Sequence, residues 1–92
     1  MSIQWLYDVI EDRKQNPSKK SYTSSLFRDG LSRIAQKVGE EGTEVVVAAL
    51  SQDDERLIAE VADLIYHTLV LLSARGIQPS QVITALEKRH RG

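Results

Sequence analysis

Apolar residues recur along this chain at the spacing of amphipathic helices, and proline, glycine and short polar runs separate the stretches. In residues 2–15 they fall at positions i, i+3, i+4 and i+7, and Ser2 is placed to cap the first turn. No stretch shows the alternation of a β-strand. The predicted helices cover, in chain order, residues 2–15, 23–30, 31–50 and 53–74, with a last helix that begins at Pro79. The pattern therefore predicts an all-α fold of four to five helices.

The two long helices are expected to form an antiparallel hairpin. The polar run Ser51-Gln52-Asp53-Asp54 separates them, and Ser51 or Asp53 can cap the second helix. The apolar face of the first long helix consists of Leu31, Ile34, Ala35, Val38, Val45, Val46 and Ala49. We expect the last helix to bury Val82, Ile83 and Leu86. The second has a wide apolar arc made of Leu57, Ile58, Val61, Leu64, Ile65, Thr68, Leu69 and Leu72. One partner helix cannot cover that arc, and a chain of 92 residues gains from further burial. We therefore expect one domain, residues 1–92, built as a helical bundle on this hairpin and assembled as a homodimer.

Four carboxylates occupy mirrored positions about the predicted turn. Glu41 and Glu44 are three residues apart on the first long helix, so they share a face. Glu60 and Asp63 have the same spacing on the second. Facing residues of an antiparallel hairpin have a constant sum of numbers, and the pairs 41 with 63 and 44 with 60 meet this condition. The sequence thus predicts four carboxylates that converge between the helices, with Glu40 at the edge.

Such a cluster is chemically suited to a hard divalent cation. Carboxylates brought together repel one another, so they take up protons, move apart or bind a cation. All-oxygen ligands suit Mg²⁺, Mn²⁺ or Ca²⁺, and Mg²⁺ commonly binds substrate phosphates as well. Glu41 interrupts an apolar stripe made of Ile34, Val38, Val45 and Ala48, where an uncompensated carboxylate would be costly. This position favours a metal site over a solvated acidic surface, and the number of carboxylates could serve more than one metal ion.

The charge distribution supports a metal–phosphate substrate. The net charge is −1, but residues 40–63 carry one basic and eight acidic side chains, while the segments on both sides are net basic. A nucleic-acid-binding protein would instead have a continuous basic face. Cysteine is absent, which excludes disulfides and thiol chemistry. Without a signal peptide or a run of about 18 apolar residues, we expect a cytoplasmic protein with no membrane segment.

Two sets of motifs resemble known proteins, one a superfamily and the other a narrower family. The pattern Glu40-Glu41-x-x-Glu44, followed by Glu60-x-x-Asp63, resembles the signature of the all-α nucleotide pyrophosphohydrolases, the MazG-like superfamily. The motif Ser21-Tyr22-Thr23, then Gly30 and the run Arg33-Ile34-Ala35-Gln36-Lys37-Val38-Gly39, is similar to the phosphoribosyl-ATP pyrophosphohydrolases of histidine biosynthesis. The resemblance covers nearly the whole chain and shows no departure at the acidic positions. In several organisms this enzyme is fused to a cyclohydrolase domain, of which nothing is present here.

The resemblance implies Mg²⁺-dependent hydrolysis of the α–β phosphoanhydride of phosphoribosyl-ATP, which yields phosphoribosyl-AMP and pyrophosphate. It also implies a helical dimer, and it makes Mg²⁺ the expected cofactor, with Mn²⁺ as a substitute. The metal ligands that it implies are Glu41, Glu44, Glu60 and Asp63. The catalytic candidates are Glu40, Glu41 and Glu44. Of these, Glu40 could orient or deprotonate the attacking water or support the metal from outside its ligand set.

Further residues are candidates for substrate binding or for structural roles. Lys37, one turn before Glu41, could bind a phosphate or simply form an ion pair along the helix. The loop candidates to hold phosphate or ribose are Lys19, Lys20, Ser21, Tyr22 and Thr23, with Arg28 beyond them. His67 could support a metal ligand, although a structural role is the stronger expectation. Trp5 and Tyr7 are expected in the core or at an interface.

Two other functions fit the same acidic pattern. One is a house-cleaning pyrophosphohydrolase that acts on canonical or damaged nucleoside triphosphates. Its acidic site would be the same, so only the substrate loop argues for phosphoribosyl-ATP instead. The other is a non-catalytic helical dimerisation module whose acidic patch binds cations. Comparing turnover of phosphoribosyl-ATP with turnover of ATP and deoxynucleoside triphosphates would separate all three.

Overall fold

The structure, a computed structural model, describes residues 2–91 and contains helices and no strand within that range. The helices are α1 (Ile3–Gln15), α2 (Tyr22–Asp29), α3 (Leu31–Ser51), α4 (Asp54–Ala74) and α5 (Pro79–Arg89). The all-α prediction is confirmed. One boundary differs slightly from the prediction: α2 begins at Tyr22, one residue before the predicted start at Thr23, so both residues form its first turn.

The helix ends have the local causes that the sequence indicates. The Ser2 hydroxyl accepts a hydrogen bond from the Trp5 backbone N–H, and the Asp53 carboxylate accepts one from that of Arg56. Asp53, not Ser51, therefore caps α4. At the other ends, Gly30 and Gly76 have φ angles of +96° and +69°, which an L side chain would disfavour.

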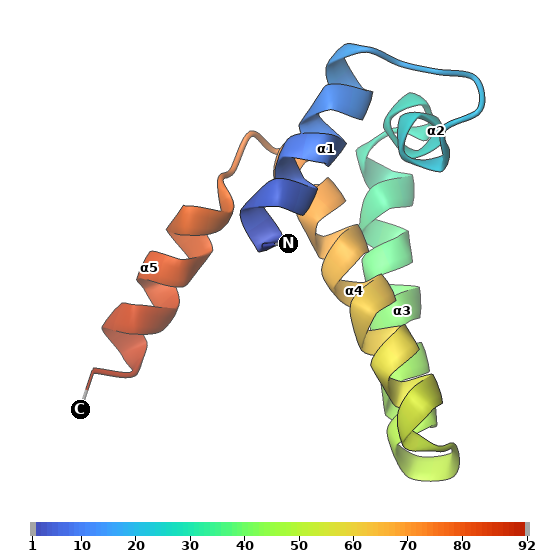
Figure 1. Ribbon diagram of the computed structural model, residues 1–92, viewed down its shortest axis with the longest axis vertical. Helices are drawn as coiled ribbons and strands as arrows, with labels where there is room; N and C mark the ends of the chain where they lie inside the picture. The colour runs from blue at the N-terminus through green and yellow to red at the C-terminus, as the bar shows by residue number, and fades with distance from the viewer. Residues whose placement is uncertain (1, 92) are drawn as a thin grey trace.

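The helices form an open arch rather than a closed bundle. The long helices α3 and α4 run side by side, joined by the two residues Gln52 and Asp53, while α1 and α2 lie against their other end (Figure 1). On the far side of α1, α5 turns away from the rest of the chain (Figure 1). The position of α5 leaves the distal part of α4 uncovered on the face that points away from α3 (Figure 1).

The buried core lies where α1, α2, α3 and α4 meet. Its fully buried apolar side chains are Tyr7, Ile10, Leu26, Ile34, Leu69 and Val70. The Tyr7 hydroxyl donates a hydrogen bond to the Ile77 carbonyl over 2.9 Å, which fixes α1 to the segment after α4. Tyr7 is thus a core residue, as expected, whereas Trp5 is exposed.

A polar network joins α1 to the end of α4. The Ser73 hydroxyl donates to the Glu11 carboxylate over 2.6 Å, and Lys14 Nζ forms an ion pair with the same carboxylate at 2.6 Å. Lys14 Nζ also donates to the Ser73 carbonyl over 2.9 Å. These three groups satisfy one another at the edge of the core, so α1 is held by polar contacts as well as by apolar packing.

Several expectations about buried faces were wrong for the single chain. Val82, Ile83 and Leu86 of α5 are exposed, and so are Leu31 and Val46 of α3. The physical reason is the arch: within the described part of the chain, residues 2–91, no helix covers these faces. At Gly39 and Gly42 an added Cβ atom would meet nothing within 4 Å, so close approach of another helix of the same chain does not explain these glycines.

One described helix, α4, is long and apolar enough to cross a membrane when only length and composition are considered. A single such helix is weak evidence for a membrane span, because core helices pass the same test. Here α4 packs against α3 and α1 and carries the buried Glu60 carboxylate in its first half. We therefore interpret α4 as a packing helix of the fold.

Candidate metal and substrate site

Three of the predicted carboxylates converge between α3 and α4. Oxygen atoms of Glu41, Glu60 and Asp63 all lie within 4.8 Å of one another. Glu41 comes from α3, and the other two come from one face of α4. We call these three residues the acidic triad. Its donor set is entirely carboxylate oxygen, which matches the ligand preference of a hard divalent cation.

Burial is uneven within the acidic triad. Glu60 is only 6% exposed. The side chain of Glu41 is 13% exposed, and Asp63 is exposed to solvent. The buried position of Glu60 follows from the rotation of α4, which turns this residue toward α3. The triad is therefore open to solvent from one side, where a substrate can reach it.

Two cations bracket the acidic triad, each four residues before a carboxylate on its own helix. Lys37 Nζ lies 3.4 Å from Glu41 Oε1 and 3.6 Å from Glu40 Oε1. Arg56 Nη2 lies 3.4 Å from Glu60 Oε1. Burial, the largest single effect, acts to lower the pKa of Lys37, but Tyr22, Glu41 and Glu40 outweigh it and raise that pKa above its ordinary value. Lys37 therefore stays charged at the acidic triad.

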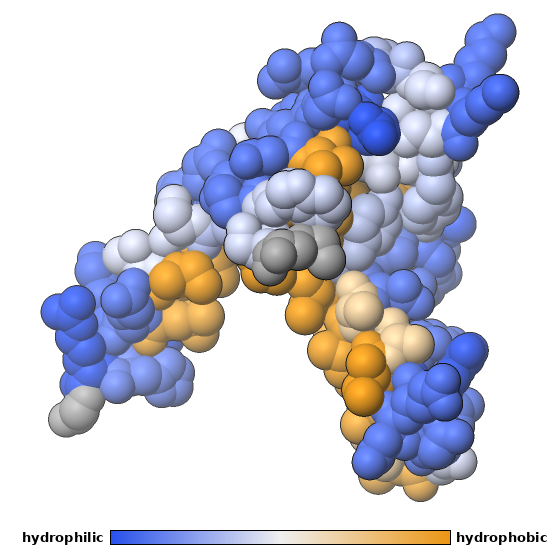
Figure 2. Space-filling model, in the orientation of Figure 1, coloured by the Kyte–Doolittle hydropathy of each residue, from blue (hydrophilic) through white to orange (hydrophobic). Residues whose placement is uncertain are grey.

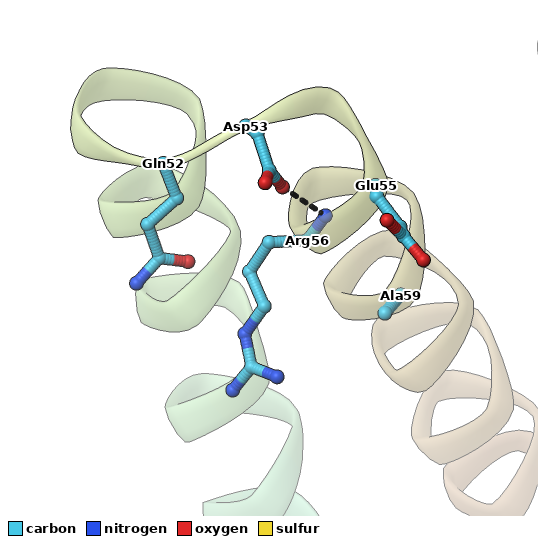
Figure 3. Close-up of a pocket in the computed structure, with 5 residues that line it drawn as sticks. All are labelled: Gln52, Asp53, Glu55, Arg56 and Ala59. Atoms are coloured by element: carbon cyan, nitrogen blue, oxygen red, sulfur yellow. Dashed lines mark hydrogen bonds between the residues drawn. The ribbon is translucent and has the colours of Figure 1, made fainter.

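Arg56 also lies in a hollow at the turn between α3 and α4. The hollow is lined by Gln52, Asp53, Glu55, Arg56 and Ala59. The Arg56 side chain extends away from the turn along the space between the helices (Figure 3). It thus connects the turn with the acidic triad. The sequence analysis missed Arg56, although its spacing to Glu60 repeats that of Lys37 to Glu41.

The other two predicted acidic residues lie outside the acidic triad. Glu44 is exposed and is not among the converging carboxylates. Glu40 is exposed as well; a hydrogen bond from Gln36 and the nearby charges of Lys37 and Arg33 lower its pKa. Both carboxylates are therefore accessible at the edge of the site, and their roles remain predictions.

The first turn of α2 reaches the acidic side of α4. The Tyr22 hydroxyl lies 3.0 Å from His67 Nε2, and His67 Nδ1 lies 2.7 Å from the Asp63 carbonyl oxygen. A carbonyl oxygen can only accept, so Nδ1 carries the proton and Nε2 accepts from Tyr22. His67 thus contacts the main chain of a predicted ligand rather than its carboxylate, which agrees with the structural role expected for it.

The remaining substrate-binding candidates are placed less closely. Ser21 caps α2 by accepting a hydrogen bond from the Ser24 N–H over 3.1 Å, and Thr23 Oγ1 is hydrogen-bonded to the Tyr66 hydroxyl. Lys19 and Lys20 are exposed in the loop between α1 and α2, and Arg28 is exposed on α2. Within residues 2–91 none of these three cations forms an ion pair. They are free to meet an anion.

Comparison with known proteins decides between the functions that fit this site. Residues 3–90 match the family described as phosphoribosyl-ATP pyrophosphohydrolase. The chain belongs to the phosphoribosyl-ATP pyrophosphohydrolase family. Among the curated relatives, the phosphoribosyl-ATP pyrophosphatase of Lacticaseibacillus casei is 54% identical over 88 residues, which are 96% of this chain and 80% of the relative.

Two further relatives of the phosphoribosyl-ATP pyrophosphohydrolase family show its range. The phosphoribosyl-ATP pyrophosphatase of Sulfurisphaera tokodaii is 51% identical over 84 residues, which are 91% of this chain and 89% of the relative. The histidine biosynthesis bifunctional protein HisIE of Xylella fastidiosa is 48% identical over 83 residues, which are 90% of this chain but 40% of that protein. The resemblance found in the sequence motifs is thus confirmed.

Proposed function

We propose that this protein hydrolyses the α–β phosphoanhydride of phosphoribosyl-ATP, which releases phosphoribosyl-AMP and pyrophosphate, in histidine biosynthesis. The single observation that carries the proposal is the acidic triad, found in a chain that matches the pyrophosphohydrolase family from residue 3 to residue 90. The family match also argues against a non-catalytic module, because the relatives are named as pyrophosphatases.

The acidic triad fits a divalent cation, which we propose to be Mg²⁺, with Mn²⁺ as a substitute. Its oxygens are close enough to share one ion, and among residues 2–91 the buried Glu60 forms an ion pair with Arg56 alone. Glu41, Glu60 and Asp63 would hold the metal, and Glu44 would complete the set from the edge. When bound, the metal would neutralise charge on the phosphate oxygens and make water more acidic.

The chain's own polar groups would bind the substrate around this centre. Lys37 and Arg56 lie at opposite ends of the acidic triad, so each could form charge-assisted hydrogen bonds with a phosphate. Glu40, which is exposed and ionised beside Lys37, is the candidate to orient the attacking water and accept its proton. The exposed cations Lys19, Lys20 and Arg28 are the candidates for the phosphate of the phosphoribosyl group.

The protein is proposed to act as a cytoplasmic homodimer of one-domain chains, residues 1–92. Apolar side chains gather along the facing sides of α4 and α5 (Figure 2). Ile65 of α4 with Val82 and Ile83 of α5 line an apolar hollow of about 290 Å³ between these helices. A second copy of the chain, with the same apolar surface, would remove this area from water.

Pyrophosphate release from phosphoribosyl-ATP and from ATP, measured with and without Mg²⁺, tests the proposed function. The parent should turn over phosphoribosyl-ATP far faster than ATP, and only with metal. Glu60→Gln, which removes one charge at nearly constant shape, should lose at least about a hundredfold in kcat/KM, since it weakens a ligand of the catalytic metal. Glu55→Gln, an exposed change on the same helix, is the matched control and should keep the parent rate.

Thermal unfolding gives an independent measure of metal binding. Mg²⁺ at about a hundred times its Kd should stabilise the parent by roughly 2.7 kcal/mol, whereas Glu60→Gln should respond much less. Equal turnover of ATP and phosphoribosyl-ATP by the parent would favour the house-cleaning alternative. A Glu60→Gln variant as active as the parent would show that the acidic triad is not the catalytic centre.

A further inference from the structure

Two adjacent residues of α2 form side-chain hydrogen bonds with two adjacent residues of α4, beside the acidic triad. Tyr22 pairs with His67 over 3.0 Å, and Thr23 pairs with Tyr66. The three rings also pack together: the Tyr22 and Tyr66 centroids are 6.3 Å apart, and Tyr66 and His67 meet edge to face at 4.9 Å. Four side chains thus join elements that are more than forty residues apart in the sequence.

These contacts are directional and partly shielded from water. His67 is buried, and burial, the largest effect, raises the pKa of Tyr66, so its hydroxyl stays protonated. Tyr22 is 51% exposed even though its hydroxyl is held by His67. The hydrogen bond fixes the position of the Tyr22 hydroxyl while the ring stays exposed. Core packing alone does not require a hydrogen-bonded hydroxyl on an exposed ring.

These contacts connect the start of α2 with the acidic triad. His67 Nδ1–H donates to the Asp63 carbonyl, which belongs to a member of the acidic triad. The segment that precedes Tyr22 is the loop with Lys19 and Lys20. A shift of Tyr22 would therefore move this loop relative to the acidic triad.

We propose that Tyr22, Thr23, Tyr66 and His67 form a clasp that positions the start of α2, and the Lys19–Ser21 segment before it, for binding phosphoribosyl-ATP. His67 is then a positioning residue, which acts through Tyr22 and does not touch the substrate. The inference rests on the proposed function and extends it. It predicts that loss of the clasp weakens substrate binding and leaves the chemical step intact, because the carboxylates of the acidic triad are unchanged.

Steady-state kinetics of three single variants test the clasp. Tyr22→Phe removes the hydroxyl and keeps the ring, and His67→Asn keeps a donor at the Nδ1 position for the Asp63 carbonyl but loses the Nε2 acceptor. Each should raise KM for phosphoribosyl-ATP about threefold to tenfold and change kcat by less than about twofold, since a smaller share of molecules has the loop in place. His67→Gln, whose amide oxygen can reach the Nε2 position, should restore KM toward the parent value.

The matched control is Thr68→Val. Thr68 makes the same kind of contact as His67, a side-chain hydrogen bond to the carbonyl four residues earlier, over 2.7 Å to Leu64. It has no contact with α2 among the hydrogen bonds of residues 2–91. This change should lower the melting temperature without raising KM. If Thr68→Val raises KM as much as Tyr22→Phe does, the rise comes from lost stability and not from a displaced loop, and the proposal is overturned.

Two further measurements separate positioning from direct contact with substrate. In the double variant Tyr22→Phe with His67→Asn, KM should be no higher than in either single variant, because both break the same hydrogen bond. Multiplied effects would mean that Tyr22 and His67 act separately. Inhibition by pyrophosphate, which needs only the metal site, should be unchanged in Tyr22→Phe, and a parallel loss there would also overturn the proposal.

Hydrogen exchange tests the clasp without any substrate. The α2 amides of Tyr22→Phe should exchange faster than those of the parent, whereas the α3 amides should not. Unchanged exchange in α2 would overturn the clasp even if the kinetics agreed. Faster exchange in α2, together with a parent that does not hydrolyse phosphoribosyl-ATP, would support the clasp while overturning the proposed function, so the two failures are distinguishable.

Discussion

The Glu60 carboxylate lies in an unfavourable environment. A carboxylate that is buried beside two other carboxylates loses hydration and meets like charge. Its compensating cation, Arg56, has a side chain that is 60% exposed and 3.4 Å away, so the pair contributes little. A bound metal ion would neutralise this charge. A buried charge that lowers the stability of the metal-free protein is common where function requires it.

Glu11 shows the opposite case, a carboxylate whose surroundings stabilise its charge. Burial, the largest effect, acts to raise the pKa of Glu11, but the hydrogen bonds from Lys14 and Ser73 and the charge of Lys14 outweigh it and lower that pKa below 4.5. The folded state therefore binds this proton less readily than the unfolded state. Its contribution to stability is present above the ordinary Glu value and is lost as pH falls through the lowered one.

We expect Glu11→Gln to flatten the acid limb of the stability curve. The free energy of unfolding, measured by urea titration between pH 3 and pH 7, should differ most between parent and variant at neutral pH and should converge in acid. A constant difference across the whole range would show that Glu11 contributes packing and no linked proton.

At the level of elements, the turn between α3 and α4 sets which carboxylates face one another. The connection has two residues, and Asp53 fixes the start of α4 by accepting from the Arg56 N–H over 2.9 Å. A shift of α4 by one residue would rotate Glu60 by about 100° away from α3, given 3.6 residues per turn. The cap therefore supports the site as well as the helix.

Asp53→Ala should destabilise the metal-free protein by about 1 kcal/mol, the usual cost of a lost cap, and lower Tm by roughly 4–8 °C. Asp53→Asn retains a side-chain acceptor and should stay within a few tenths of a kcal/mol of the parent. Thermal unfolding followed by circular dichroism measures both. If the two variants unfold at the same temperature, the hydrogen bond to Arg56 does not cap α4.

At the level of the whole molecule, the arch explains why so much apolar surface is exposed. In addition to α5, the distal ends of α3 and α4 expose Val46, Val47, Leu50 and Ile58. Isolated apolar residues on a surface are ordinary, but a patch that continues over several helices marks an interaction site. The arch thus presents a surface suited to a second copy of the same chain.

Sedimentation at micromolar concentration should give about twice the chain mass of 10.3 kDa. Ile65→Glu would place a charge in the apolar hollow between α4 and α5, and it should shift the protein toward monomer because a buried unpaired charge is costly. Ser32→Glu, an exposed position on α3, is the charge-matched control. A parent that sediments as a monomer would rule out the proposed homodimer.

The sequence by itself determined the helices, most of their starting residues and the existence of an acidic motif. Helix period and capping depend on residues within one or two turns, so Ser2 and Pro79 could be assigned from their neighbours alone. For α4 the sequence left Ser51 and Asp53 as alternatives, and the structure shows that Asp53 is the cap. The spacing of Glu60 and Asp63 on one helical face is local in the same sense. Even the expectation that α3 carries Glu41 inside an apolar stripe agrees with its low exposure.

Only the tertiary structure decided how those faces are used. The burial of Glu60, the place of Glu44 outside the acidic triad and the pairing of Tyr22 with His67 depend on how each helix is rotated about its axis. The exposed face of α5 depends on the direction in which the chain leaves Gly76. Rotation and direction are set by the packing of distant side chains, and a periodic pattern read along one helix contains no information about them.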